Sequence, residues 1–219
     1  MGSALGERPV SAEDASARST LTGWRVVRHH LRTTLRTGAM PVGARVVSRI
    51  VAAAEELDHH PDLDLRYATV EVSVTTHSMG TLTEADVVLA ERITAIADEL
   101  GVPLDPTRSN DLEIGIAVVR PEEVRAFWEA VLGYEDDDGE LSDPSGRLPH
   151  VWFRRVAERP PQGVVDLEVH VPHDVAEARV RAAVAAGGRL VSDAQAPSRW
   201  VLADPEGAEV RVCTWLERH

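Results

Sequence analysis

Two hydrophobic periodicities alternate along the first half of the chain, and they restrict the fold more than any other feature of the sequence. Apolar residues recur every three or four positions at 42–57 and again at 83–100, which indicates two amphipathic helices. At 67–77 they alternate with polar residues, as in a half-buried strand. The stripe that we expect the first helix to bury consists of Val42, Val46, Val47, Ile50, Val51, Ala54 and Leu57.

Shorter signals complete this half of the chain. Ser11 is placed to cap a short helix, and residues 24–27 and 29–35 have the composition of a strand pair. The predicted order is therefore helix, two strands, helix, strand, helix. This order is typical of an α+β fold in which an antiparallel sheet carries its helices on one face.

A stretch rich in turn-forming residues then divides the chain. Residues 101–110 contain two prolines, a glycine and several short polar residues, which favours a linker between two domains. We therefore predict a first domain at 1–102, a linker at 103–110 and a second domain at 111–219.

The second half repeats one pattern of elements. Strands are expected at 112–119, 150–156, 164–171, 189–191, 200–203 and 209–214, and helices at 121–132 and 175–186. A strand, a helix and further strands, given twice, predict paired βαβββ modules. The acidic run 135–138 lacks the spaced ligands of a calcium loop, so we expect a solvated loop there.

The composition excludes several classes of function. The formal net charge is −13, and a surface this acidic repels phosphate backbones, so nucleic acid is not an expected partner. We expect no membrane span, because no apolar run reaches the length of one. Residues 1–18 lack the apolar core of a secretory signal, and the single cysteine, Cys213, has no partner for an internal disulfide. Both observations favour a cytoplasmic protein.

The strongest chemical signal is a group of histidines with acidic company. His59 and His60 precede Pro61, Glu55 lies one helical turn before His59, and His77 follows at the end of the predicted strand. Pro61 also fixes the helix end, because it disfavours helical geometry in the residue before it. Imidazole is the side chain best suited to moving protons near neutral pH, so this group predicts acid–base chemistry.

The spacing of these residues resembles the pterin-4a-carbinolamine dehydratase family. The resemblance covers residues 11–100 and rests on Gly23, Trp24, Glu55, His59, His60, Pro61, Tyr67, Thr76, His77, Gly80, Leu82, Thr83 and Asp86. It implies a small α+β domain that assembles as a homodimer or homotetramer. It also implies the dehydration of 4a-hydroxytetrahydrobiopterin to the quinonoid dihydropterin, in tetrahydrobiopterin recycling, without metal or bound cofactor.

The resemblance further implies that His59, His60 and His77 surround the pterin as catalytic residues. We expect His59 and His77 to exchange protons and His60 to orient the substrate, since two imidazoles can protonate the leaving hydroxyl and deprotonate a ring nitrogen. Glu55 is expected to support His59 by raising the basicity of its ring. Asp86 is expected to support the catalytic histidines. Pro61, Tyr67 and Thr76 are expected to bind the substrate.

Structural alternatives stay open for several of these residues. The adjacent histidines suit the end of a helix, where they can interact with its last carbonyl groups. Thr83 and Asp86 have the spacing of a capping box, which would make the acid a structural residue. Tyr67 suits a core position, and a zinc site made of the three histidines is a weaker alternative.

Four positions depart from the family pattern. Leu63 stands where an aromatic residue is common, Thr81 where a second glycine is common, and Leu35 and Met40 where phenylalanine is expected. We expect these changes to affect the pocket wall and the substrate preference before they affect the acid–base groups.

The second half resembles the glyoxalase/bleomycin-resistance (vicinal oxygen chelate) superfamily across residues 111–216. The resemblance rests on Phe127, Trp128, Leu132, Gly133, Tyr134, Asp166, Leu167, Val169, Gly187, Asp204, Pro205, Gly207 and Glu209. It implies that Glu113 and Asp166 fall near metal-ligand positions, whereas Arg211 occupies the last one. A guanidinium there repels a cation, so we expect no conventional metal centre.

The sequence therefore predicts a cytoplasmic two-domain lyase that acts on a pterin carbinolamine. Three alternatives remain at this point. In the first, the second domain is a metal-dependent enzyme and the first domain serves assembly. In the second, neither domain is catalytic and the chain is a binding or dimerisation protein that has kept a pterin pocket. In the third, the pocket takes a different pterin or a natural-product intermediate.

Overall fold

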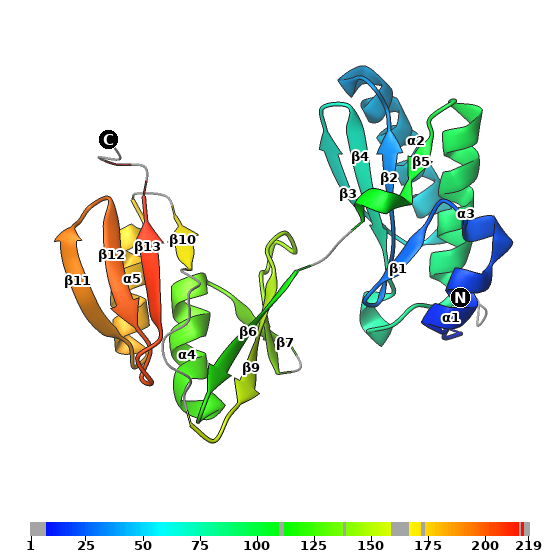
Figure 1. Cartoon of the computed structure of the whole chain (residues 1–219). Coiled ribbons are helices and arrows are strands. Elements are labelled where there is room, and N and C mark those ends of the chain that lie inside the picture. The colour runs from blue at the N-terminus through cyan, green and yellow to red at the C-terminus, as the bar shows by residue number, and fades with distance from the viewer. Residues whose placement is uncertain are drawn as a thin grey trace. The chain divides into compact units, whose positions relative to one another are not determined.

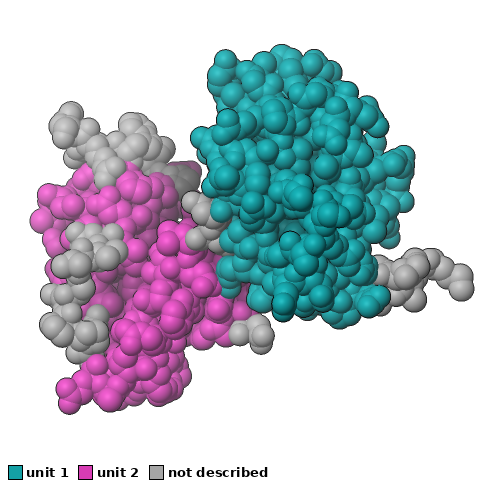
Figure 2. All heavy atoms as spheres, turned by 45° about the vertical axis from the view of Figure 1, so that its right-hand side comes forward, with its two compact units in different colours: residues 1–111 teal, residues 112–219 magenta. Residues whose placement is uncertain are grey.

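The computed structural model describes residues 8–109, 112–137, 139–158, 167–171, 174–214 and 216. The chain forms two compact units, Met1–Asp111 and Leu112–His219, which Figure 2 shows in teal and magenta. Each unit has its own hydrophobic core. Among the helices of the described part of the chain, none has both the length and the apolar character that crossing a membrane requires.

The first unit is an antiparallel sheet with its two long helices on one face (Figure 1). The strands follow the order β1-β2-β4-β3, and β5 also pairs with β2. The elements are α1 (Ala12–Ala17), η1 (Ser19–Leu21), β1 (Arg25–Val27), β2 (His30–Arg36), α2 (Met40–Leu57), β3 (Asp62–Arg66), β4 (Thr69–Val74), η2 (His77–Met79), α3 (Glu84–Glu99), β5 (Leu104–Asp105) and η3 (Pro106–Arg108). The predicted α+β architecture is confirmed.

The buried stripe of α2 is narrower than predicted. Val46, Ile50 and Ala54 are buried at the spacing of a helix face that packs on the sheet. Val51 and Leu57 were expected in this stripe, but their exposed fractions are 46% and 39%. They point away from the sheet, because a helix that packs on one layer buries only the side that faces it.

Two segments of the first unit differ from the prediction. Residues Asp62–Arg66 form β3, which pairs with β4 from Asp62 opposite Ser73 to Arg66 opposite Thr69, and no strand was expected there. Residues 103–110 were interpreted as a linker, yet Leu104–Asp105 pairs with β2 as β5. The Arg36 guanidinium binds the Asp105 carboxylate through its Nε atom at 2.9 Å, so this segment belongs to the first unit.

The second unit consists of two βαβββ modules, as the duplicated pattern predicts. The sheets follow the orders β6-β9-β8-β7 and β10-β13-β12-β11, and in each the first and last strands of the module pair in parallel. The elements are β6 (Glu113–Val118), α4 (Pro121–Leu132), β7 (Glu135–Asp137), β8 (Glu140–Ser142), β9 (His150–Arg155), β10 (Glu168–His170), α5 (Ala176–Ala185), β11 (Arg189–Gln195), β12 (Arg199–Ala203) and β13 (Glu209–Cys213).

The acidic segment of the second unit was predicted as a loop, and this was wrong. Residues Glu135–Asp137 form β7, which pairs with β8 as a hairpin on the edge of its sheet. The strand is exposed along its length, so its charges stay in water while its backbone bonds to β8. Charged side chains on an edge strand also discourage pairing with another chain.

One core joins the helices of the two modules. Phe127 and Trp128 of α4 are fully buried, with their rings edge to face at a centroid distance of 5.4 Å. The Trp128 indole donates a hydrogen bond to the buried Asp204 carboxylate at 3.1 Å. Trp128 therefore ties α4 to the turn between β12 and β13, and the residue is structural.

Candidate functional site

The end of α2 presents the paired histidines. The helix stops at Leu57, and Asp58 adopts the left-handed conformation with φ of 49°. The chain leaves the helix through this residue and enters β3 at Asp62, with Pro61 between the two elements. His59 and His60 thus lie in a short connection that is fixed at both ends, by the helix and by the sheet.

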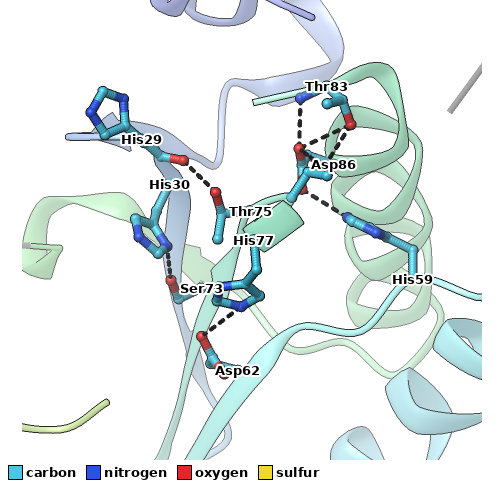
Figure 3. Close-up of polar contacts among 10 residues, drawn as sticks. His29, His30, His59, Asp62, Ser73, Thr75, His77, Thr83 and Asp86 are labelled. Carbon is cyan, nitrogen blue, oxygen red and sulfur yellow. Dashed lines mark hydrogen bonds and ion pairs between the residues drawn. The ribbon is translucent and has the colours of Figure 1, made fainter. Parts of the chain in front are cut away.

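His59 faces inward and meets a buried carboxylate. Its Nε2 atom lies 2.8 Å from Oδ1 of Asp86, in the first turn of α3 (Figure 3). The side chain of Asp86 is fully buried and that of His59 is 15% exposed. An ionised carboxylate can only accept hydrogen bonds, so the proton between the two groups belongs to Nε2 of His59. In a neutral ring the lone pair is then on Nδ1, where it can accept a proton.

The same carboxylate organises the start of α3. Its Oδ2 atom accepts from the Thr83 backbone N–H at 2.6 Å and from the Thr76 hydroxyl at 2.8 Å. Thr83 and Asp86 form a complete capping box. The sequence left a structural and a functional role of Asp86 as alternatives. The geometry shows the structural role, the capping of α3, and also places the carboxylate against the His59 ring.

These contacts decide the charge of Asp86. Burial raises the pKa of this carboxyl, but the hydrogen bonds from His59, the Thr83 N–H and Thr76 lower it, and the net pKa lies below its ordinary value. The group is therefore an anion at neutral pH. A buried anion beside an imidazole fixes the orientation of the ring and stabilises positive charge on it.

The Glu55 carboxylate meets His60 and not His59, so its observed partner differs from the predicted one. The Glu55 carboxylate was expected to support His59, but it lies 3.0 Å from Nε2 of His60. Both side chains of this pair are more than half exposed. The left-handed conformation of Asp58 ends the helix before His59, so the helical i, i+4 spacing that would place Glu55 beside His59 does not apply.

His77 was predicted on a strand, but β4 ends at Val74 and His77 begins the short helix η2. Its Nε2 atom lies 4.0 Å from Oδ2 of Asp62, and both side chains are 70% exposed. In Figure 3, His77 extends toward Asp62, which immediately follows Pro61. Each of the three histidines therefore lies near a different carboxylate, namely Asp86, Glu55 or Asp62.

Sequence reasoning missed a polar group beside His77. On the sheet face away from the helices, Asp62 lies directly opposite Ser73, and the Ser73 hydroxyl is 3.0 Å from Nδ1 of His30. The neighbouring His29 accepts a hydrogen bond from the Thr75 hydroxyl through its backbone oxygen at 2.7 Å. Asp62 lies next to Ser73 because it belongs to β3, a strand that the sequence did not predict.

The structure does not bring Tyr67 to the histidines. It lies in the turn between β3 and β4 and is 78% exposed. That turn is at the far end of the hairpin from Asp62, about 16 Å away at the usual rise of a strand. A cavity of about 330 Å³ lies at this far end, lined by Arg36, Gly38, Ala68, Thr69 and Arg108. The histidines do not line it.

The remaining predicted positions have mixed outcomes. Thr76 contacts Asp86 and forms an isolated bridge with Thr81. Leu63 packs against the core of the first unit. Pro61 is half-buried between His60 and β3. Of the other departures from the family pattern, Leu35 is buried and Met40 is 41% exposed at the start of α2.

Of the metal-ligand positions that the resemblance implies in the second unit, the structure describes Glu113 and Arg211. Glu113 begins β6, where His150 of β9 is its partner in the parallel pair. Asp166 lies outside the described residues. Arg211 lies on β13 opposite Glu168 of β10, and a guanidinium has no lone pair to offer a cation.

The first unit therefore presents a half-buried imidazole, His59, held by Asp86, and an exposed imidazole, His77, near Asp62 at the start of β3. Imidazole side chains are the groups most often used to transfer protons to and from a substrate. The side chains of His60 and His77 are 58% and 70% exposed, so both rings are accessible from solvent.

Each half of the chain is similar to a known protein family. Residues 8–96 match the family model of pterin 4 alpha carbinolamine dehydratase, and residues 113–213 match that of a glyoxalase-like domain. A Mycolicibacterium smegmatis protein named "Putative pterin-4-alpha-carbinolamine dehydratase" is 38% identical over 84 residues, which are 38% of this chain and 89% of the relative. A Streptomyces coelicolor protein of the same name is 41% identical over 91 residues, 41% of this chain and 90% of the relative.

Solved structures are similar to each unit. A transcriptional coactivator/pterin dehydratase from Brucella melitensis is 26% identical with a TM-score of 0.38, and the match covers 41% of this chain and 99% of that one. A glyoxalase/bleomycin resistance protein/dioxygenase family enzyme from Burkholderia phytofirmans is 18% identical with a TM-score of 0.39, and the match covers 47% of this chain and 95% of that one. On the sequence identity of its relatives and their coverage, the chain belongs to the pterin-4-alpha-carbinolamine dehydratase family and carries a glyoxalase-like domain behind the dehydratase unit.

Proposed function

We propose that the first unit dehydrates a pterin 4a-carbinolamine, of which 4a-hydroxytetrahydrobiopterin is the expected example, to the quinonoid dihydropterin. In this reaction the bond between carbon 4a and the hydroxyl oxygen breaks, the hydroxyl takes a proton and leaves as water, and a ring nitrogen loses a proton. One acid and one base are sufficient, and neither a metal nor a redox cofactor enters the balance.

The His59–Asp86 pair is the observation that carries this proposal. An ionised, fully buried carboxylate 2.8 Å from Nε2 keeps that nitrogen protonated, so a neutral His59 ring has its basic lone pair on Nδ1. We assign His59 the removal of the proton from the ring nitrogen. The imidazolium that results is stabilised by the carboxylate behind it, in the manner in which an aspartate supports a catalytic histidine.

We assign the acid step to His77. Its ring is 70% exposed, so a bound substrate can reach it, and Asp62 lies 4.0 Å from its Nε2 atom. His60 is held by Glu55 on the surface and is assigned to substrate orientation. This division follows the contacts: the ring with a buried carboxylate acts as the base, and the most accessible ring delivers the proton.

The proposal is tested by stopped-flow measurement of carbinolamine loss with the wild type, His59→Ala and His77→Ala. Each variant should lower turnover by about a hundredfold, the usual contribution of a positioned acid or base. His29→Ala is the matched control, because its side chain is exposed and its hydrogen bond with Thr75 is made by the backbone oxygen. Wild-type turnover in both the His59 and His77 variants would overturn the assignment.

We also propose that the chain forms a homodimer or homotetramer, as the family resemblance implies. Met40 and Val51 are 41% and 46% exposed and lie three turns apart on one face of α2. A second copy of this chain would cover that face. Light scattering of the purified protein should give a multiple of 23.8 kDa that Val51→Glu reduces, and a monomer at micromolar concentration would contradict the proposal.

A further inference from the structure

Three metal-ligating side chains meet on the second sheet of the glyoxalase-like unit. Glu168 and His170 lie on β10, and Cys213 lies at the end of β13, directly opposite His170 in the parallel pair. One donor atom from each of the three lies within 4.8 Å of the others. The Nε2 atom of His170 is 3.4 Å from Oε2 of Glu168.

The strand register explains why they converge. Side chains alternate between the faces of a strand, and Val169 and Val212, which separate these residues from their neighbours, pack into the core of the second unit. Glu168, His170 and Cys213 therefore share the opposite face. Cys213 is fully buried there, whereas the side chains of Glu168 and His170 are 35% and 52% exposed. An ion has access from the solvent side, and the sulfur closes the site from within.

The distances suit a tetrahedral ion. Zn²⁺ bonds of about 2.0–2.2 Å to nitrogen and oxygen and about 2.3 Å to sulfur place neighbouring donors about 3.3–3.7 Å apart. The histidine and glutamate donors already have this separation. The donor at up to 4.8 Å needs to close by about 1 Å, which side-chain rotation provides.

The donor set selects the metal. One imidazole nitrogen, one carboxylate oxygen and one cysteine sulfur suit a borderline-soft ion such as Zn²⁺, whereas Ca²⁺ and Mg²⁺ require sets of oxygen ligands. Three protein ligands also leave a fourth position for water or a small ligand. We propose that Glu168, His170 and Cys213 form a Zn²⁺ site in the second unit, with ligands other than the Glu113 and Asp166 that the resemblance implies.

Two arginines oppose the ion and set its affinity. Arg211 lies opposite Glu168, and Arg199 of β12 lies opposite Cys213, both on the face of the proposed ligands. Their positive charges weaken cation binding without supplying or removing a ligand. Neutralising Arg211 should therefore tighten Zn²⁺ binding if the ion lies beside Glu168.

The test uses the full chain with Zn²⁺ alone, and with Co²⁺ as a spectroscopic substitute. Calorimetry should give one Zn²⁺ per chain, and the Co²⁺ protein should show a thiolate-to-metal charge-transfer band in the near ultraviolet. Cys213→Ser should abolish the band, and His170→Ala should weaken Zn²⁺ binding at least about tenfold. Arg211→Gln should strengthen it several-fold.

Two controls keep the test decisive. Glu168→Gln changes an exposed side chain, so its affinity loss is measurable even if Cys213→Ser fails to fold. His29→Ala should leave Zn²⁺ binding unchanged, and the dehydratase rate should be the same with and without the ion. Zn²⁺ binding that survives in both Cys213→Ser and Glu168→Gln, or a Co²⁺ complex without a thiolate band, would overturn the proposal.

Discussion

Neutralising Asp86 without changing its shape is the sharpest perturbation of the dehydratase site. In Asp86→Asn the side-chain oxygen can still accept from the Thr83 N–H, which is 2.6 Å away in the wild type, so the start of α3 stays capped. The contact with His59 loses its charge. The substitution therefore separates the capping of α3 from the contact with His59.

The expected size of the effect follows from the His59 contact. A hydrogen bond to a charged partner contributes about 1.5–3 kcal/mol, and the full burial of Asp86 means that water does not replace it. If the bond acts in the transition state, this energy corresponds to about a 10- to 150-fold loss in kcat. The free energy of unfolding should fall by the same amount, about 1.5–3 kcal/mol, which is what one charge-assisted bond contributes.

The pH dependence of stability supplies an independent readout. The folded pKa of Asp86 lies below its ordinary value, so its stabilisation is complete above the unfolded pKa of about 3.9 and is lost as the pH falls through the folded pKa. Urea unfolding should therefore give a constant difference between wild type and Asp86→Asn above pH 5, which shrinks below pH 4.

Asp98→Asn is the matched control, since it makes the same change at an exposed position of α3. It should shift the unfolding free energy by less than about 0.5 kcal/mol and leave turnover unchanged. Wild-type kcat in Asp86→Asn would refute the reasoning, and so would a stability difference that is independent of pH down to 2.

Three further outcomes follow from the contacts. Glu55→Gln should change turnover by less than about threefold in the carbinolamine assay, because its pair with His60 is exposed and such pairs contribute about 0–1 kcal/mol; a hundredfold loss would contradict this. Asp143→Ala should destabilise the second unit by about 1–2 kcal/mol in urea unfolding at neutral pH. Burial raises the pKa of Asp143, but hydrogen bonds from the Ser145 hydroxyl and from backbone N–H groups lower it to about 2, so the loss should disappear as the pH falls from 4 to 2. Trp128→Phe should cost about 1.5–3 kcal/mol by leaving the buried Asp204 carboxylate without the indole donor, and an unchanged melting temperature would contradict it.

The helices and the alternating strand could be read from the sequence because periodicity alone defines them. Pro121–Leu132 was predicted with the bounds that α4 has, since a proline opens it and a glycine closes it. The strand β3 carried a weaker signal. Leu63 and Leu65 alternate with charged residues there, but aspartate is a poor strand former, and pairing with β4 decides the outcome.

The candidate site was predictable in its residues and less so in their pairing. The types and spacing of His59, His60 and His77 were visible in the sequence, whereas their carboxylate partners depend on tertiary contacts. Asp86 is 27 residues from His59, and the left-handed Asp58 ends the helix before His59, so the helical i, i+4 spacing does not give the partner of Glu55.

The role of His77 in moving a proton can be tested most directly by chemical rescue. In His77→Ala the lost ring leaves a site whose wild-type side chain is 70% exposed, so free imidazole can enter it. Carbinolamine dehydration by this variant should rise in proportion to added imidazole, while the wild type and His29→Ala should not respond. A His77→Ala variant that binds the pterin normally, turns over slowly and gains nothing from imidazole would contradict proton transfer by this ring.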